Sequence, residues 1–416
     1  QGGLDPLVIT KADGIYFWDE NGKKYSDMSS QLVNSNLGHG NKAITDAIIE
    51  QAQKIPFMGP AFAMDCRSDA AEAVVKATGF ADGAKVFFTN AGAESNENAI
   101  KIARQYTGKQ KIFSQYRCYH GSSAGAGMLT GEPRHFFNEP GGPGFVKYDG
   151  PYAYRAPKAC RFANDDEVAD FYLELLENQI LYEGPDQIAA IWLESVVGSN
   201  GVLIAPVKWY QGVRALCDKY DILMVADEVQ CGNCRTGKYF ASEYWAEEGA
   251  APDIITTAKS LGAGMPISAI TARAEIMDAA PAGTIGGTYC GNPLACAAAI
   301  KTMEIMKEED YCAKSLHIGS VVRKAFEEMK EKYDIIGDVR GIGGMLGVEF
   351  VKDKESKEPN PEFVSKLVQT ALQKGLLLEN AGSSSNVVRF LAPLCMTEEQ
   401  MEAGLKIFEE SILANL

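Results

Sequence analysis

Short apolar runs alternate with helical patterns through the middle of the chain. Residues 85–89 form an apolar run that predicts a strand, and apolar positions at helical spacing predict a helix over residues 93–106. Similar runs predict strands over residues 111–115, 188–193, 222–226, 253–257 and 267–271. Strands that alternate with helices are typical of parallel strands joined by crossover helices. We therefore expect an α/β fold with a mostly parallel central sheet covered by helices.

The two ends of the chain follow different patterns. Near the N-terminus, apolar and polar residues alternate around the turn Asn21-Gly22, which indicates a small antiparallel piece. From residue 310 the pattern favours long amphipathic helices, with strands over residues 341–350 and 387–390 and a final helix after Thr397. We expect residues 1–50 and 310–416 to form one small α+β domain beside a large domain of residues 51–309.

Composition narrows the class of protein. The 416 residues are 46% hydrophobic, which is enough for a large core and excludes disorder. The 40 basic and 55 acidic side chains give a net charge of −15, and no dense basic run offers a nucleic-acid surface. No apolar stretch approaches the roughly 18 to 20 residues of a membrane-spanning helix. We therefore expect a soluble protein with neither a nucleic acid nor a membrane as partner.

The first residues and the cysteines suggest a location. Residues 1–6 show no basic segment followed by an apolar one. Because the chain lacks an initiator Met, we expect that the natural N-terminus has been trimmed and that targeting information could be lost with it. The 10 cysteines follow no scaffold spacing, which fits a reducing cytoplasm. Cys231 and Cys234 form a CxxC motif without a second pair of ligands, so we expect local packing and no metal site.

Side chains capable of chemistry follow several of the predicted strands. They are Asn90-Ala-Gly92, Tyr119-His120, Glu194, Asp227-Glu228 and Lys259. In open α/β sheets, ligands bind at the carboxyl ends of the strands. We therefore expect these side chains to converge on one site.

Three of these segments together suggest one cofactor. Small residues after Asn90 allow backbone N–H groups at a helix start to hold a phosphate, although a tight turn explains them equally well. Asp227 ends a buried strand and needs a cation, either in a structural salt bridge or on a protonated heterocycle nitrogen. A lowered pKa would make Lys259 a nucleophilic amine, although most lysines after strands are simply solvated. Pyridoxal phosphate needs all three groups together.

Several segments along nearly the whole chain occur in one characteristic order and spacing. They are Asn36-Leu-Gly-His-Gly40, Asn90-Ala-Gly-Ala-Glu94, Tyr119-His-Gly121, Asp227-Glu-Val-Gln230, Lys259 with its glycines, Gly287-Thr-Tyr-Cys-Gly-Asn-Pro293 and Val388-Arg-Phe390. Taken together, they resemble the class III, fold-type-I pyridoxal-phosphate aminotransferases. The resemblance implies that fold, a transaminase activity and pyridoxal 5'-phosphate as the cofactor.

The resemblance also implies roles for the matched residues. Lys259 would bind the cofactor covalently and later move a proton on the substrate, while Asp227 would pair with the pyridinium nitrogen. Gln230 would donate to the phenolic oxygen of the cofactor. Backbone N–H groups of Gly92 and Ala93 would contact the phosphate, and Val229 and Tyr119 would lie on the two faces of the ring. Glu194 and His120 would be orienting groups near the ring, and Thr288 would contribute a hydroxyl from the partner subunit. The partner's hydroxyl implies a homodimer, or a pair of such dimers, with shared active sites.

Ser199, Arg389 and Leu32 are the expected substrate contacts. Many relatives that use ornithine or 4-aminobutyrate place a Glu where Ser199 stands, and that Glu pairs with the arginine that Arg389 matches. Because Ser199 cannot neutralise Arg389, we expect an unpaired guanidinium that demands a carboxylate or sulfonate. The sequence most resembles the taurine:pyruvate and ω-amino-acid:pyruvate branch, so we expect taurine or β-alanine as donor and pyruvate as acceptor. A dicarboxylate such as 2-oxoglutarate would need a second cation, which the sequence does not reveal.

Other functions remain open from the sequence. One alternative is an aminotransferase of the 4-aminobutyrate or ornithine type that uses 2-oxoglutarate. Another is an amino-acid racemase or epimerase on the same fold, because reprotonation of a substrate carbanion on either face needs no new cofactor chemistry. A third is a catalytically silent binding protein, which the intact Lys259, Asp227 and Gln230 argue against.

Overall fold

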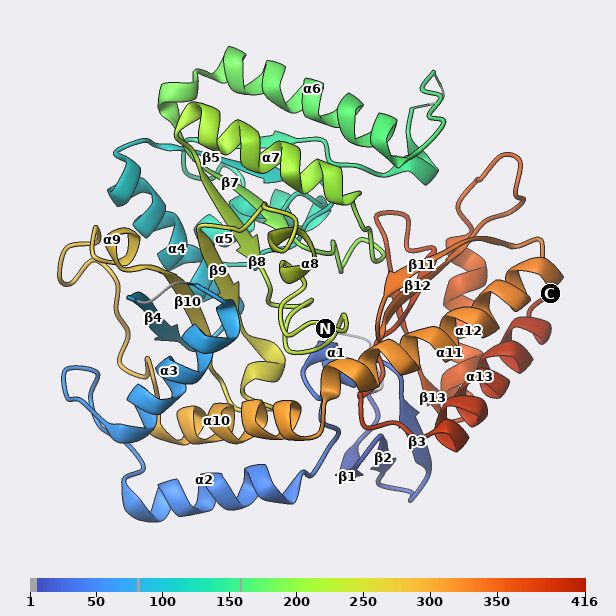
Figure 1. Ribbon diagram of the computed structural model, residues 1–416. Coiled ribbons are helices and arrows are strands. Elements are labelled where there is room, and N and C mark those ends of the chain that lie inside the picture. The colour runs from blue at the N-terminus through green and yellow to red at the C-terminus, as the bar shows by residue number, and fades with distance from the viewer. Residues whose placement is uncertain (1–5, 81–82, 158) are drawn as a thin grey trace.

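The computed structural model describes residues 6–80, 83–157 and 159–416 of the chain. Three sheets and the helices around them make up this part of the molecule (Figure 1). Most of the N-terminal stretch considered above for a leader, residues 1–5, lies outside the described residues.

The largest sheet has seven strands in the order β4-β10-β9-β8-β7-β5-β6. Their bounds are β4 (Ala84–Thr89), β5 (Lys111–Gln115), β6 (Phe145–Tyr148), β7 (Ile188–Glu194), β8 (Leu223–Asp227), β9 (Ile254–Thr257) and β10 (Ser268–Arg273). The predicted strands are confirmed, and β5 to β9 pair in parallel. The exception is β10, which runs antiparallel to both of its neighbours. The sheet is therefore mostly parallel, as expected, with antiparallel pairing at β10.

Helices cover both faces of the large sheet (Figure 1). On one face, α6 (Asp165–Glu183) and α7 (Val207–Tyr220) pack against Ile191 and Leu193 of β7. On the other face, α4 (Gly92–Thr107) and α9 (Ala274–Met277) pack near Trp192. All seven residues of β7 are buried because neighbouring side chains point to opposite, covered faces. The remaining helices before residue 310 are α1 (Ser30–Val33), α2 (Lys42–Lys54), α3 (Asp65–Thr78), α5 (Ala124–Leu129), α8 (Glu243–Ala246) and α10 (Pro293–Glu308).

The two chain ends meet in two smaller sheets. One has the order β1-β2-β3-β13, so a strand from the C-terminal part completes the antiparallel N-terminal piece. The other has the order β11-β12-β15-β14, and an apolar cluster joins it to helices of the same region. The bounds are β1 (Ile9–Asp13), β2 (Tyr16–Asp19), β3 (Lys24–Asp27), β11 (Ile336–Ile342), β12 (Met345–Phe350), β13 (Leu376–Leu377), β14 (Glu379–Ala381), β15 (Val387–Phe390), α11 (Tyr311–Lys332), α12 (Pro361–Gln373) and α13 (Glu398–Leu413).

The segment of residues 341–350, predicted as strand, contains the end of β11, a turn and the whole of β12. β11 begins at Ile336, and Gly343 with Gly344 turns the chain into β12. Gly343 has φ +52°, and a Cβ there would lie 2.5 Å from the backbone of Thr236. A glycine is therefore required where this turn meets the large sheet's loops. The domain boundaries at residues 50 and 310 stay a prediction.

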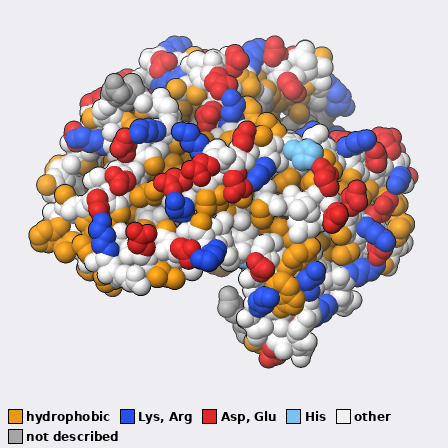
Figure 2. Space-filling view, turned by 60° about the horizontal axis from the view of Figure 1, so that its bottom comes forward, with side chains coloured by type: hydrophobic (Ala, Val, Ile, Leu, Met, Phe, Trp, Pro, Cys, Tyr) orange, Lys and Arg blue, Asp and Glu red, His pale blue; other side chains and the backbone are white. Residues whose placement is uncertain are grey.

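Acidic and basic side chains are interspersed on the face of the molecule that Figure 2 shows. Among the helices within the described ranges, none is long and apolar enough to cross a bilayer. The same residues contain no cluster of three or more His, Cys, Asp or Glu side chains arranged to hold a metal ion.

Candidate active site

The predicted strand ends converge on one cavity. Glu194 and Asp227 are the last residues of neighbouring parallel strands and stand in register, and Lys259 follows β9 by two residues. The cavity has a volume of about 350 Å³, within the range of small-molecule sites. Its walls include most of the expected cofactor contacts: Gly92, Ala93, Tyr119, His120, Glu194, Asp227, Val229, Gln230 and Lys259. Their convergence is therefore confirmed.

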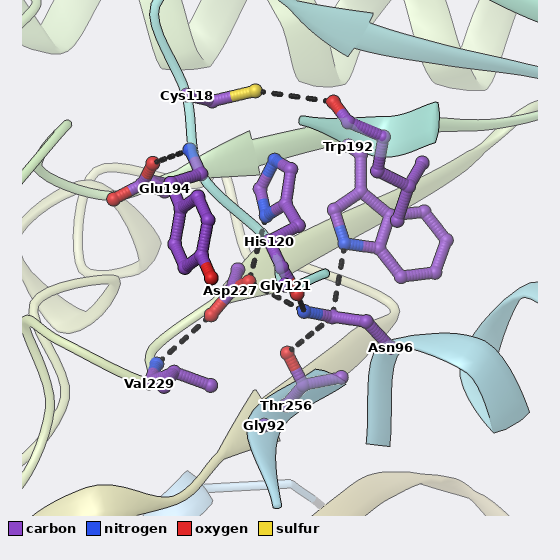
Figure 3. A network of polar contacts seen from close by, with 12 residues as sticks. Gly92, Asn96, Cys118, His120, Gly121, Trp192, Glu194, Asp227, Val229 and Thr256 are labelled. Carbon is purple, nitrogen blue, oxygen red and sulfur yellow. Dashed lines mark hydrogen bonds and ion pairs between the residues drawn. The ribbon is translucent and has the colours of Figure 1, made fainter. Parts of the chain in front are cut away.

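Asp227 is held by three hydrogen bonds (Figure 3). Its Oδ2 accepts from Asn96 Nδ2 at 2.8 Å and lies 2.7 Å from His120 Nδ1, and its Oδ1 accepts from the Val229 N–H at 3.0 Å. The residue is 2% exposed, so an unpaired charge would be costly there. These contacts fix the carboxylate in one orientation at the edge of the cavity.

His120 is a candidate cationic partner of Asp227 within the protein. Burial lowers the pKa of His120, but Cys118 and the hydrogen bond and charge of Asp227 outweigh burial and raise the pKa to about 10. This direction favours the charged form of the imidazole, whose Nδ1 lies 2.7 Å from Asp227 Oδ2. The imidazole side chain itself is fully buried. Asp227 Oδ1 accepts from the Val229 N–H, and Asp227 is one of the residues that line the cavity.

Asn96 was not singled out by the sequence. It lies one turn after Gly92 on α4, and its amide uses all of its hydrogen-bonding capacity. Nδ2 donates to Asp227 and to the His120 carbonyl, while Oδ1 accepts from Trp192 Nε1 at 3.2 Å and Thr256 Oγ1 at 3.0 Å (Figure 3). A buried polar residue on a helix face that is otherwise apolar is the signal that could have identified it.

Lys259 sits in a strained backbone conformation. Its φ is +50°, in the left-handed region that costs a residue with a Cβ roughly 1–2 kcal/mol. Burial lowers the pKa of its amine to about 8, and the nearby Arg389 charge adds to this, against the opposing charges of Glu194 and Asp227. A substantial fraction of the side chain is therefore a neutral, nucleophilic amine near physiological pH.

Glu194 organises the loops around the cavity. Oε1 accepts from the Tyr119 N–H at 2.7 Å and Oε2 accepts from the Gly198 N–H at 3.0 Å. Burial raises the pKa of Glu194 to about 7, with a further contribution from Asp227, although the charge of His120 opposes the rise. Glu194 stands next to Asp227 in the sheet, and its expected orienting role stays a prediction.

The start of α4 offers a cradle for an anion. No side chain caps this helix, and Glu94 instead accepts from the Asn90 N–H at 2.7 Å. The first helical N–H groups, which include those of Gly92 and Ala93, thus face the cavity with the positive end of the helix dipole. A Cβ at Gly92 would lie 2.9 Å from Val229 Cγ1, so only a glycine allows this close approach.

The second carboxylate of the Asp227-Glu228 pair has a different role. Glu228 is fully buried and accepts from the Ser242 N–H at 2.7 Å and the Ala241 N–H at 2.9 Å, away from the cavity. The cysteines of the CxxC motif are also buried free thiols, and Cys231 Sγ contacts the Asp227 carbonyl at 3.6 Å. Both features stabilise the loop that carries Val229 and Gln230.

The expectation that Arg389 is unpaired is wrong. Arg389 Nη2 donates to Glu379 Oε2 at 2.7 Å, and the two residues stand directly opposite each other on β15 and β14. Arg389 Nη1 also lies 3.5 Å from Gln230 Oε1, and Gln230 Nε2 donates to Ser199 Oγ at 3.3 Å. Ser199 therefore contacts the arginine only indirectly. The carboxylate that Ser199 cannot supply comes from a neighbouring strand.

Four expected contacts are not among the residues that line the cavity of this chain: Ser199, Arg389, Leu32 and Thr288. Leu32 is 66% exposed and belongs to a turn in which Ser30 to Val33 all have positive φ. Thr288 is also exposed, in the loop before α10. Neither side chain meets the other cofactor-binding residues within a single chain.

The chemistry of the cavity defines the class of protein. A lysine, a buried carboxylate and an uncapped helix N-terminus meet at the carboxyl ends of a mostly parallel sheet, and these groups fit pyridoxal phosphate in charge and in size. The profile of the family Aminotransferase class-III matches residues 2–412. The chain belongs to the class III aminotransferases, pyridoxal-phosphate-dependent enzymes that act on an amine and an oxo acid.

Relatives and solved structures agree with this family. A taurine:2-oxoglutarate aminotransferase from Bifidobacterium kashiwanohense, solved with pyridoxal phosphate and glutamate, has a TM-score of 0.93 and 39% identity over 100% of this chain and 95% of that one. A 5-aminovalerate aminotransferase of Pseudomonas aeruginosa is 35% identical over 98% of this chain and 94% of its own length. A leucine/methionine racemase of Thermococcus litoralis is 34% identical over 98% and 90%.

Replacing the two expected catalytic residues should have different effects. Lys259→Ala should abolish turnover because no other amine in the cavity can take its place, whereas Asp227→Asn should retain the cofactor but slow turnover by at least about a hundredfold. Turnover and cofactor absorbance of the purified variants measure both effects. Lys85→Ala, which removes an exposed ion pair with Asp278, is the control and should leave both unchanged. Normal turnover by Lys259→Ala would refute the assignment.

Cofactor uptake by the apoenzyme should depend on pH in a defined direction. Only the neutral amine of Lys259 reacts with an aldehyde, so the rate should rise with pH. It should reach half its maximum near pH 8, the value to which burial and the Arg389 charge lower the pKa of this amine, rather than near 10.5. Arg389→Ala should move this midpoint to higher pH because the arginine charge lowers the pKa of Lys259. Stopped-flow absorbance measures the rates. A midpoint that stays the same or falls in Arg389→Ala would contradict the electrostatic account.

Proposed function

We propose that this aminotransferase takes the amino group from a small ω-amino acid or amino sulfonate, such as β-alanine or taurine, and transfers it to a 2-oxo acid. The observation that carries the proposal is the position of Arg389: its Nη1 lies 3.5 Å from Oε1 of Gln230, which lines the same cavity as Lys259. A donor with its amine at one end and its acid at the other would place the two groups at Lys259 and Arg389.

The residues of the cavity would hold pyridoxal phosphate from several sides. Gly92 and Ala93 would donate backbone N–H groups to the phosphate, and Val229 and Tyr119 would enclose the ring. Asp227 would pair with the ring nitrogen, supported by its hydrogen bonds to Asn96 and His120, and Gln230 would donate to the phenolic oxygen. When bound, the cofactor supplies an electron sink for the carbanion that forms at the substrate's amine-bearing carbon.

Lys259 would perform the proton transfer. Because its pKa lies near 8, the released amine can take a proton from the amine-bearing carbon and return it elsewhere. Glu194 would keep Tyr119 and the 195–201 turn in position through its two backbone hydrogen bonds. The two half-reactions of transamination both use these groups in turn.

The acceptor depends on how many cations the cavity offers. Pyruvate needs only one, and the sequence argument for pyruvate rested on an unpaired Arg389, a premise that Glu379 removes. Arg134 is a second cation in the same region: it pairs with Glu132, and its guanidinium lies 3.9 Å from the centroid of the Tyr119 ring, which lines the cavity. We therefore favour a dicarboxylate acceptor such as 2-oxoglutarate, the acceptor named for the Bifidobacterium relative.

An amino-acid racemase is the second candidate, and the Thermococcus litoralis relative supports it. Both activities would use Lys259 and Asp227. A racemase would interconvert enantiomers without an added oxo acid and would form no ketone or aldehyde product. Product analysis with a single amino acid, in the presence and absence of 2-oxoglutarate, separates the two.

A panel of donors and acceptors tests the substrate class. Taurine and β-alanine should react faster than ornithine, and 2-oxoglutarate should be preferred to pyruvate. Arg389→Ala should raise the KM for acidic donors by at least about tenfold because it removes a buried charge-assisted contact, while 1-propylamine should be much less affected. Arg134→Ala, whose side chain is about half exposed, should raise the KM for 2-oxoglutarate but not for pyruvate. Equal losses for acidic and neutral donors in Arg389→Ala would contradict the proposal.

Activity should require a dimer. Thr288 adjoins Tyr289, which is 62% exposed and contacts Phe57, itself 43% exposed, at 5.7 Å between ring centroids. Such apolar exposure fits a surface that a second copy covers, and obligate interfaces of this kind bury more than about 2,000 Å². Tyr289→Glu should weaken the dimer and lower activity in parallel, measured by analytical ultracentrifugation and turnover. Tyr182→Glu, on the 93% exposed α6 position, is the control. Full activity from a monomer would refute this.

The cytoplasmic location stays a prediction. All 10 cysteines of the chain carry free thiols in the structure, as a reducing compartment would require.

A further inference from the structure

Glu379 and Arg389 form an ion pair at the border between the small sheet and the cavity. They are cross-strand neighbours in register, with Glu379 Oε2 2.7 Å from Arg389 Nη2. Arg389 follows Val388 and precedes Phe390, which both point into the apolar cluster of the C-terminal region. The arginine side chain therefore points to the opposite face, toward Gln230 of the cavity wall.

Arg389 is buried and has N–H donors without a strong hydrogen-bond partner. The residue is 7% exposed, its Nε has no partner, and its contact with Gln230 Oε1 is long at 3.5 Å. Buried N–H donors are nearly always paired in folded proteins. A guanidinium with one strong carboxylate contact and unfilled donors, beside a residue of the cavity wall, is suited to receive a second acidic group.

The side chain of Glu379 is more exposed to solvent than that of Arg389. Its side chain is 21% exposed, whereas that of Arg389 is 9% exposed. It lies on β14, which is the edge strand of its sheet, so one side of the strand faces away from other strands. A glutamate side chain can leave an ion pair by rotating about its own torsions without any movement of the backbone. The pair can therefore open on the Glu379 side at low cost.

We propose that Glu379 is a movable counter-ion that sets which substrates Arg389 accepts. With no acid in the cavity, or with an uncharged amine donor, Glu379 neutralises the guanidinium. When a donor or oxo acid brings a carboxylate or sulfonate, that group takes Arg389 and Glu379 rotates toward solvent. This inference rests on the proposed function, because it assumes that Arg389 recognises the acid of the substrate.

The arrangement explains how the site works without a glutamate at position 199. Ser199 reaches only Gln230, at 3.3 Å, and carries no charge. A fixed, unpaired arginine would reject neutral substituents because an alkyl chain would displace the water that hydrates the guanidinium. A permanently paired arginine would instead reject acids. A counter-ion on the neighbouring strand allows one cavity to accept both kinds of substrate in turn.

The test compares two donors that differ only in their acid group, β-alanine and 1-propylamine, in the holoenzyme. In Glu379→Gln, kcat/KM for 1-propylamine should fall at least about tenfold, because Arg389 is left without a counter-ion. For β-alanine it should change by less than about twofold, because the substrate carboxylate supplies the missing charge. Glu379→Asp keeps the charge and should preserve the wild-type ratio. Glu358→Gln, from an exposed ion pair with Lys352, should change neither donor.

A binding measurement gives a second readout that damage to the fold would not produce. Propionate carries the acid but neither amine nor ketone, so it binds without reacting. Its dissociation constant for the holoenzyme, measured by calorimetry, should be at least about fivefold lower in Glu379→Gln, because propionate no longer displaces a competing carboxylate. A misfolded variant would instead bind more weakly.

Two results would overturn the proposal. One is an equal loss for both donors in Glu379→Gln, and the other is an unchanged or weaker affinity for propionate. The failure of the proposed function would look different: wild type would fail to transaminate any donor of the panel. In that case propionate binding to wild type and Glu379→Gln still decides whether Glu379 competes for Arg389.

Discussion

The site depends on one buried charge, the carboxylate of Asp227. It ends a strand whose five residues are all buried, where an unsupported anion would be unstable. The protein surrounds it with Asn96 from α4, His120 from the loop after β5 and the backbone of Val229. Each of these groups belongs to a different segment, so the orientation of Asp227 depends on how all three segments pack at this edge of the sheet.

The other charges of the cavity are balanced around this carboxylate. Asp227 helps to raise the pKa of Glu194 to about 7, while Asp227 and Glu194 together oppose the burial that lowers the pKa of Lys259 to about 8. Arg389 acts on Lys259 in the opposite direction. The charges of Arg389 and Lys259 are therefore coupled, so a change at Arg389 should alter the pKa of the Lys259 amine.

The sequence predicts the elements of this site well because the signals are local. Apolar runs that end in Asp227 or precede Lys259 identify strands, and parallel strands bring their ends together without further information. The antiparallel direction of β10 has no such signal, because an apolar run looks the same in either direction. The motifs of the family similarly identify residues but not their partners.

The pairing of Arg389 shows where prediction from sequence ends. Ser199 suggested an unpaired guanidinium because the expected glutamate is missing at that position. Glu379 precedes Arg389 by ten residues, and only the register of β14 on β15 places the two opposite each other. Asn96 is similar, since its role follows from four contacts with distant segments. Long-range register and buried polar networks are set by tertiary packing.

The most direct measurement is the identification of the residue that binds the cofactor. The holoenzyme is reduced with borohydride, digested and analysed by mass spectrometry for a peptide that carries the reduced pyridoxyl phosphate group. If Lys259 is the nucleophile at the end of β9, the group is found on Lys259 in stoichiometric amount. Labelling of a different lysine, or no covalent labelling of a catalytically active protein, would contradict the account.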